Sequence, residues 1–311
     1  MANRHFLCVT LSFVLALASN WECHVAALSS FSSTRQHHHQ QQQRSTIRNL
    51  QHLQASVADV DQAAASNTEA KSLRLFSPCK INLFLRILRK KEDGYHDLAS
   101  LFQAVGFGDT LELSPLESGE ERDEFSCNME GVPVDSSNLV LRALQLMRDK
   151  TGIQQYYKAN LIKQVPAQAG LGGGLANAAT ALWGANQLMG NPASLEQLVE
   201  WSGALGSDIT FFLSKGTAYC TGRGEIMDPM DPPLPSGTNV CIVKPNIGLS
   251  TPQVFKALEY DKLSTLDAKE ILLPAFLKGV DTVPAEYFIN DLELPAFKCV
   301  PELQTLKEEL C

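Results

Sequence analysis

A glycine-rich segment that leads directly into a helix is the feature of this sequence with the clearest capacity for chemistry. It runs from Pro166 to Ala179 and contains Gly170-Leu171-Gly172-Gly173-Gly174-Leu175-Ala176-Asn177. So many glycines do not sustain a helix up to Gly174, whereas apolar residues recur with helical spacing from Leu175 to Met189. A glycine loop at a helix N-terminus offers backbone N–H groups and the positive end of the helix dipole to an anion. The segment therefore predicts either a phosphate site or a tight turn needed only for packing.

This loop departs from the two commonest nucleotide-binding signatures. The sequence contains no GxxxxGK[ST], and Asn177 stands where the dinucleotide pattern GxGxxG requires glycine. Because Gly172, Gly173 and Gly174 have no Cβ, a polyphosphate can still approach their backbone closely.

Two further segments place single charged residues where they could act on a phosphate. Alternating residues from Leu73 to Arg89 predict a strand with Lys80 and Asn82 on the same face. Asp208 directly precedes the apolar run Ile209 to Leu213. From the residues alone, the favoured interpretations are a solvated strand residue for Lys80 and a helix N-cap for Asp208.

Composition argues against several other classes of protein. The chain has 311 residues, is 44% hydrophobic and carries a formal net charge of −8 without a long run of one sign, which is untypical of nucleic-acid binding. No apolar stretch reaches the roughly 18 residues of a membrane span. Beyond Cys8 and Cys23 the cysteines form no CxxC pair, and His96 is the only histidine after residue 70, so a zinc cluster or a disulfide framework is not expected. The predicted partners are small molecules, with no nucleic acid and no membrane for the mature protein.

Residues 1–70 are interpreted as a targeting leader followed by a linker. Met1 to Asn20 has the basic start, apolar run and small residues of a signal peptide, and from Cys23 to Val57 the chain is rich in Ser, Gln, His and Arg without any acidic residue. The two in series predict a plastid protein imported by way of the secretory pathway. A secreted protein and a wrongly assigned start codon remain alternatives.

The rest of the chain predicts a mixture of strands and helices in two domains, residues 71–227 and 236–311. Beyond the elements already named, we expect a turn at Asp93-Gly94, extended structure from Ala99 to Leu113 and a strand at Val240 to Lys244. Helices are expected at Asn138 to Lys150, from Ser194 to near Gly206, at Thr251 to Leu258 and at Glu302 to Leu310. Ser194 and Gln197 predict a capping box at the start of the second of these helices. The prolines between Asp228 and Pro235 leave no room for regular structure and mark a candidate domain boundary.

Six segments, in chain order, resemble the GHMP kinases. They are Pro78-Cys79-Lys80-Ile81-Asn82, Asp93-Gly94-Tyr95-His96, Asn138-Leu139, the loop from Pro166 to Ala179, Leu205-Gly206-Ser207-Asp208 and Asn290-Asp291-Leu292-Glu293. The resemblance runs from about Ser77 to the end of the chain. It implies an α+β fold with an N-terminal ribosomal-protein-S5-like domain and a C-terminal ferredoxin-like domain. It also implies an enzyme that uses ATP, accompanied by Mg²⁺, to phosphorylate a hydroxyl group of a small molecule.

The same resemblance assigns roles to residues. Asp208 would accept the proton of the substrate hydroxyl, beside Lys80, which would stabilise charge on the transferred phosphoryl group. The residues expected to bind ATP are Pro166, Gly170, Leu171, Gly172, Gly173, Gly174, Asn177, Asn138 and Lys163. For Asn138 a helix N-cap, and for Lys163 a solvated lysine, are equally good interpretations.

The expected substrate is a cytidine diphosphate derivative. The run Gly94-Tyr95-His96 is similar to the branch of the family that phosphorylates such a derivative of an erythritol on the route to isoprenoid precursors. By that resemblance Tyr95 and Phe255 would sandwich the cytosine, His96 would hydrogen-bond to it, and Asn82, together with Thr251, would contact the substrate. Core packing for the two rings, and a turn residue for His96, are the alternatives.

Two departures from the family pattern leave other functions open. Leu175 and Ala176 replace two serines of the usual glycine loop, and the family's third glycine motif does not occur before Cys311, so we expect an incomplete C-terminal domain. Thr210, where the family usually has proline, is a milder change. The alternatives are a pseudokinase that only binds nucleotide and a GHMP kinase acting on another small alcohol, such as homoserine or mevalonate.

Overall fold

The computed structural model describes residues 7–11, 14–18, 72–206, 208–235, 237–245 and 247–310. The predicted leader and linker therefore lie outside the described residues, apart from two short strands. Those strands, β1 (Leu7–Leu11) and β2 (Val14–Ala18), pair with each other and, through β2, with β9 (Val240–Val243). In the described part of the chain, no helix combines the length and the apolar character needed to cross a membrane.

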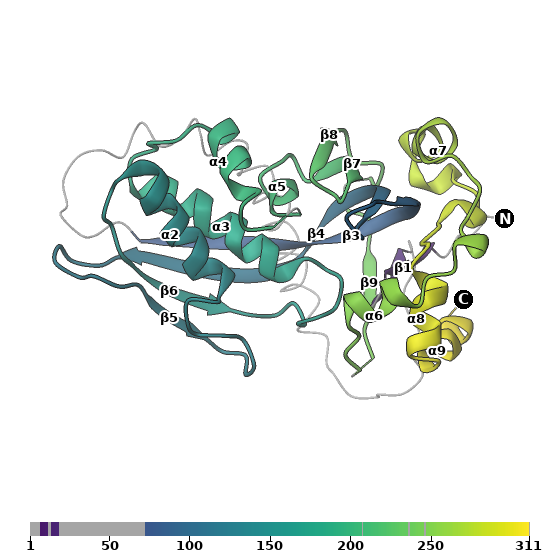
Figure 1. Cartoon of the computed structure of the whole chain (residues 1–311), viewed down its shortest axis with the longest axis horizontal. Coiled ribbons are helices and arrows are strands. Elements are labelled where there is room, and N and C mark those ends of the chain that lie inside the picture. The colour runs from purple at the N-terminus through teal and green to yellow at the C-terminus, as the bar shows by residue number, and fades with distance from the viewer. Residues whose placement is uncertain are drawn as a thin grey trace, which may run out of the picture.

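A six-stranded sheet organises the molecule (Figure 1). Its strands are β3 (Leu73–Lys90), β4 (His96–Pro115), β5 (Glu124–Cys127), β6 (Tyr157–Ile162), β7 (Thr217–Gly222) and β8 (Ile226–Pro229). The order is β5-β6-β4-β7-β8, with β3 paired to β4, and only β5 and β6 are parallel. The predicted strand, the turn at Asp93-Gly94 and the extended segment after it are confirmed as this β3–β4 hairpin.

Helices cover one end of the sheet and form what we call the first lobe, residues 110–206 and 208–213. They are α2 (Leu139–Thr151), α3 (Gly173–Leu188), α4 (Leu195–Ser202) and α5 (Ile209–Phe212). Apolar residues of the sheet such as Leu111 and Tyr157 pack there against Leu144 and Leu182 of α2 and α3. The predicted capping box of Ser194 with Gln197 is confirmed.

Several predicted boundaries are wrong by a few residues, and the helix expected to reach Leu258, for example, ends at Lys256. Helix α3 already begins at Gly173, because the loop glycines can adopt helical backbone angles once the following turn is packed. Helix α4 ends at Ser202 rather than near Gly206. Strand β8 includes Asp228 and Pro229, because a proline is tolerated at the end of an edge strand.

Short helices build what we call the second lobe, residues 237–245 and 247–310. After β9 come α6 (Thr251–Lys256), η2 (Tyr260–Lys262), the π-helical turn η3 (Ala268–Leu272), α7 (Leu273–Leu277), η4 (Val280–Thr282), η5 (Ala285–Tyr287), α8 (Glu293–Cys299) and α9 (Glu302–Leu310). The mixture of helices and mainly antiparallel strands confirms the α+β class. The domain boundaries at 227 and 236 stay predictions.

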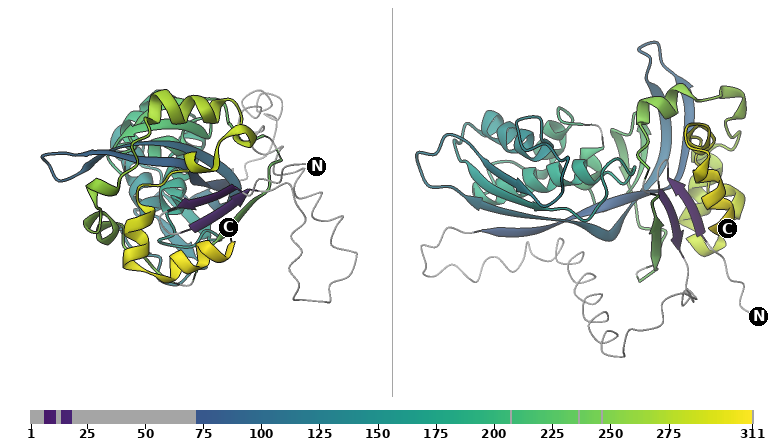
Figure 2. Two further views of the ribbon diagram at one scale, coloured as in Figure 1. Left: turned by 90° about the vertical axis from the view of Figure 1, so that its right-hand side faces the viewer. Right: turned by 90° about the horizontal axis from the view of Figure 1, so that it is seen from below.

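The long hairpin of β3 and β4 joins the two lobes, and its turn projects from the second-lobe end of the molecule (Figure 2). Buried residues of this hairpin, including Leu83 and Leu101, share one apolar cluster with Leu272 and Phe276 of the second lobe. Residues 79–87 of β3 are therefore buried on both faces, which places Lys80 and Asn82 inside the protein.

Candidate active site

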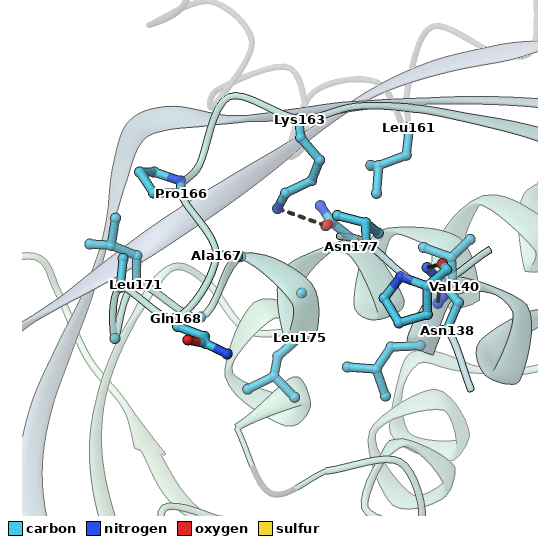
Figure 3. A pocket seen from close by; sticks show the side chains of 18 of the residues that line it. Asn138, Val140, Leu161, Lys163, Pro166, Ala167, Gln168, Leu171, Leu175 and Asn177 are labelled. Atoms are coloured by element: carbon cyan, nitrogen blue, oxygen red, sulfur yellow. Dashed lines mark hydrogen bonds between the residues drawn. The ribbon is translucent and has the colours of Figure 1, made fainter. Parts of the chain in front are cut away.

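A cavity of about 380 Å³ opens between the glycine loop and the start of α2. Parts of residues 132–140, 161–163 and 166–177 line it (Figure 3). All nine residues expected to bind ATP are among the lining residues. The structure thus brings the predicted set together, and contact with ATP stays a prediction.

The glycine loop is shaped by close contacts from its neighbours. Gly172, at the N-terminus of α3, has a φ of 70°, and a Cβ there would lie 2.8 Å from the ring of Phe212. A Cβ on Gly173 would lie 2.9 Å from Val165, whereas one on Gly174 would meet nothing nearer than Leu139 at 3.8 Å. Packing therefore requires glycine at positions 172 and 173, and at 174 it leaves the helix N-terminus open to a ligand.

A buried polar network holds the floor of the cavity. Asp109, fully buried, pairs with the Lys163 ammonium at 2.5 Å and accepts hydrogen bonds from Asn177 Nδ2 and from two backbone N–H groups, those of Gln164 and Val165. Lys163 is only 8% exposed, so its interpretation as a solvated lysine is wrong. Asn177, at the start of α3, also accepts from Lys163 Nζ, and this bond is visible in Figure 3. Asp109 was not predicted as a site residue, because only its partners in space reveal its role.

Asn138 is confirmed as a helix N-cap. Its side-chain oxygen accepts from the Val140 N–H, and its Nδ2 donates to the Pro133 carbonyl. Since Asn138 also lines the cavity, the cap fixes one of its walls.

Lys80 lies beside the glycine loop, on β3. Its backbone N–H donates to the Leu171 carbonyl at 2.9 Å. Its ammonium donates to Asn82 Oδ1 at 2.8 Å and sits 4.3 Å from the centre of the Phe102 ring. Asn82 in turn donates to Ser100, so the polar face predicted for this strand is a buried hydrogen-bonded chain. The interpretation of Lys80 as a solvated residue is wrong.

Asp208 occupies the N-cap position of α5 but makes no side-chain capping bond. Burial raises the pKa of its carboxyl, Lys80 opposes this shift by lowering it, and Glu225 adds to it. Burial likewise lowers the pKa of Lys80, against the opposing effect of Asp208. A Cβ on Gly224, in the β7–β8 turn, would lie 2.6 Å from Asp208 Oδ1, so that turn closes directly over the carboxylate.

Apart from Asn82, which lies beside Lys80 on β3, the residues predicted for the substrate lie around the turn of the β3–β4 hairpin and on α6. Tyr95 is 57% exposed, which excludes core packing, and the guanidinium of Arg223 lies 4.2 Å from its ring centre. His96 stacks on Phe255 with ring centres 4.9 Å apart. Thr251 is exposed at the first position of α6. Arg223 and His96 thus lie against the two predicted stacking rings.

Three residues near these groups escaped the sequence analysis. Gln168 lines the cavity with a φ of 53°, an uncommon angle for a residue with a side chain. Arg223 lies in the turn between β7 and β8 and contacts the turn of the β3–β4 hairpin in two ways. Its guanidinium packs on the Tyr95 ring, and it forms an ion pair with Asp93 at 3.7 Å. Tyr260 hydrogen-bonds to His96 at 2.7 Å. Gln168 lies within the glycine-rich segment but was given no role there, whereas Arg223 and Tyr260 fall in no recognisable motif, and only the positions of neighbouring segments reveal them.

Comparisons with known proteins identify relatives of this chain. A family model described as the GHMP kinases N terminal domain matches residues 138–216. The chain is 47% identical over 258 residues to 4-diphosphocytidyl-2-C-methyl-D-erythritol kinase, chloroplastic, of Oryza sativa subsp. japonica, covering 83% of this chain and 63% of that protein. It is 44% identical to 4-diphosphocytidyl-2-C-methyl-D-erythritol kinase of Protochlamydia amoebophila, covering 77% of each.

A solved structure adds the same relationship at the level of the fold. The crystal structure of a 4-(cytidine 5'-diphospho)-2C-methyl-D-erythritol kinase superimposes with a TM-score of 0.59 at 26% identity, covering 75% of this chain and 81% of that one. The chain thus spans less than two thirds of the rice relative's length, and most of the length of the bacterial relative and of the solved structure.

Proposed function

The chain belongs to the 4-diphosphocytidyl-2-C-methyl-D-erythritol kinase family of GHMP kinases, and on this premise we propose that it phosphorylates the 2-hydroxyl of 4-diphosphocytidyl-2-C-methyl-D-erythritol with ATP. The reaction would serve the non-mevalonate route to isoprenoid precursors. The observation that carries the proposal is the glycine-lined cavity with buried Lys80 beside its loop, hydrogen-bonded to the Leu171 carbonyl, and with Asp208 near enough to affect the pKa of that lysine.

The chemistry divides between these two residues and the loop. The substrate oxygen would form a bond to the γ-phosphorus while the bond to the β-phosphate oxygen breaks and ADP leaves with the electron pair; the hydroxyl proton would pass to Asp208. A raised pKa makes the ionised Asp208 a better base than an exposed aspartate. Lys80 and the backbone N–H groups at the start of α3 would stabilise charge on the phosphoryl group, where positioning and electrostatics supply most of the rate.

The nucleotide would occupy the cavity between Asn138 and the glycine loop, over the network that Asp109 holds. Mg²⁺ would come with ATP, bound chiefly by phosphate oxygens and water. Within the described residues, no group of three or more His, Cys, Asp or Glu side chains could hold a metal ion alone. On the substrate side, Asn82 and Thr251 would contact the substrate, with Tyr95, His96 and Phe255 around the cytosine.

The test is turnover of the purified full chain with ATP and the cytidine substrate, followed by ³¹P NMR of the product. Asp208→Asn should abolish turnover while calorimetry still detects both ligands. Turnover that persists in Asp208→Asn would refute the catalytic assignment.

A pseudokinase is the second candidate, favoured by Leu175 and Ala176 at the start of α3. Leucine and alanine have no hydroxyl to offer to phosphate or magnesium. Leu175 nevertheless lines the cavity, whereas Ala176 is fully buried. Binding of ATP and the cytidine compound by the wild-type chain without any turnover would establish this alternative. Faster phosphorylation of homoserine or mevalonate would instead overturn the substrate assignment.

We propose a plastid location, supported by the chloroplastic rice relative and by the composition of residues 1–70. The route through a signal peptide belongs to the same proposal. A fluorescent protein fused to residues 1–70 should accumulate in plastids; retention in the cytosol or release to the medium would contradict it.

A further inference from the structure

Three aromatic rings from separate parts of the chain meet near the turn of the β3–β4 hairpin. His96 begins β4, Phe255 lies on α6 and Tyr260 opens η2. The His96 ring lies at 28° to Phe255 and at 17° to Tyr260, whose ring centre is 6.1 Å away. The Tyr260 hydroxyl is 2.7 Å from His96 Nε2. Tyr260 is 48% exposed, so burial of its ring does not by itself explain this position.

The hydrogen bond has a preferred direction. Burial, with Lys90 nearby, lowers the pKa of His96 below its ordinary value, so the imidazole is neutral at pH 7. A neutral imidazole has one N–H and one bare nitrogen. A phenol is a stronger donor and a weaker acceptor than an imidazole nitrogen, because its oxygen lone pair is delocalised into the ring. Tyr260 therefore donates, Nε2 accepts, and the proton of His96 is on Nδ1.

We propose that Tyr260 is a positioning residue that holds His96 in the Nδ1–H tautomer and so makes it a hydrogen-bond donor to the substrate base. The role in base recognition rests on the proposed function, whereas the tautomer itself does not. Cytosine presents acceptors at N3 and O2 and a donor at its 4-amino group. The Nδ1–H tautomer would select the acceptors; the other tautomer would select the amino group.

The tautomer can be read directly, without substrate, by NMR of the full-length protein labelled with ¹⁵N-histidine. The His96 signals are identified by their loss in His96→Gln. We expect protonated Nδ1 and bare Nε2 in the wild type. Tyr260→Phe keeps the ring and removes the hydroxyl, so His96 should shift toward the Nε2–H form that a free imidazole side chain prefers in water. A wild-type His96 protonated at Nε2 would overturn the proposal.

Kinetics test the consequence for recognition. Tyr260→Phe should raise the KM for the cytidine substrate about tenfold, the effect of losing one well-placed hydrogen bond, with kcat and the KM for ATP nearly unchanged. Tyr287→Phe, the same change at a half-buried tyrosine packed in the core shared by the two lobes, is the control and should leave both KM values and the tautomer unchanged.

The two readouts separate the possible failures. If the tautomer is as expected but Tyr260→Phe leaves the KM unchanged, the positioning role is refuted. If the wild-type chain turns over no substrate, the proposed function fails, and calorimetric affinity for the cytidine compound takes the place of KM in the same comparison.

Discussion

Asp208 is held between a positive and a negative neighbour, and its ionisation decides whether it can accept a proton. Lys80 lowers the pKa of this carboxyl, while burial and Glu225 raise it. Activity that depends on the ionised form is lost as the pH falls through the pKa. A substitution that lowers the pKa of Asp208 should therefore move the acid limb of the pH–rate profile to lower pH, and one that raises this pKa should move the limb to higher pH.

Glu225→Gln removes a charge that raises the pKa of Asp208, so the acid limb of the kcat profile should move to lower pH. Asp228→Asn removes the same charge from an exposed position on β8 and should leave the limb in place. The measurement is kcat against pH with both substrates saturating. A Glu225→Gln limb at the wild-type position would mean that another group controls the acid side.

Leu175 is the residue that most separates this chain from the loop expected of a kinase. Leu175→Ser restores a hydroxyl at the N-terminus of α3, and we expect kcat to rise at least tenfold, toward the roughly 10²-fold that a donor to a developing phosphate charge is worth. Leu175→Ala removes the same bulk without adding a hydroxyl and should change kcat little. Equal gains in both variants would show that side-chain volume, rather than the hydroxyl, limits the enzyme.

At the scale of elements, an ion pair holds the second lobe onto β3. The carboxylate of Asp291 accepts from Arg86 Nε at 2.9 Å, from the Ile87 N–H at 2.7 Å and from the Ser264 N–H at 3.1 Å, and its own N–H donates to the Leu85 carbonyl. Both side chains are at most 7% exposed. This explains the Asn290-Asp291-Leu292-Glu293 segment, to which the sequence analysis gave no role.

Asp291→Ala should lower the free energy of unfolding by about 3 to 5 kcal/mol, because it leaves a buried guanidinium unpaired. The measurement is urea unfolding, compared at equal m-values. Asp97→Ala breaks a pair with Arg89, which is 75% exposed, and should change stability little. A small effect of Asp291→Ala would mean that water or another acceptor reaches Arg86.

The elements that could be predicted are those whose signals are local. Alternation over Leu73 to Arg89 located β3, and the capping box at Ser194 located the start of α4. Sequence alone did not show that β3 is buried on both faces, because that depends on helices from distant segments. For the same reason Asp109 and Tyr260 were missed, since their partners lie 54 and 164 residues away.

At the scale of the whole molecule, the two lobes share one apolar core. The ring of Phe276, on α7, lies 5.5 Å from that of Phe84 on β3 and 5.0 Å from that of Phe288. The same cluster continues through β3 and β4 to Val165 and Leu171, next to the glycine loop. A core continuous from one lobe to the other couples their unfolding.

Phe276→Ala tests this coupling, because it removes a buried ring from the second lobe while Trp183 and Trp201 report on the first. The loss should be about 3 to 5 kcal/mol, as for other buried phenylalanines. If the core is shared, the urea midpoints from tryptophan fluorescence and from far-UV circular dichroism should fall together. Leu277→Ala, on the same helix but 49% exposed, should move neither midpoint by much. A fluorescence midpoint that stays at the wild-type value while the dichroism midpoint falls would show that the lobes unfold independently.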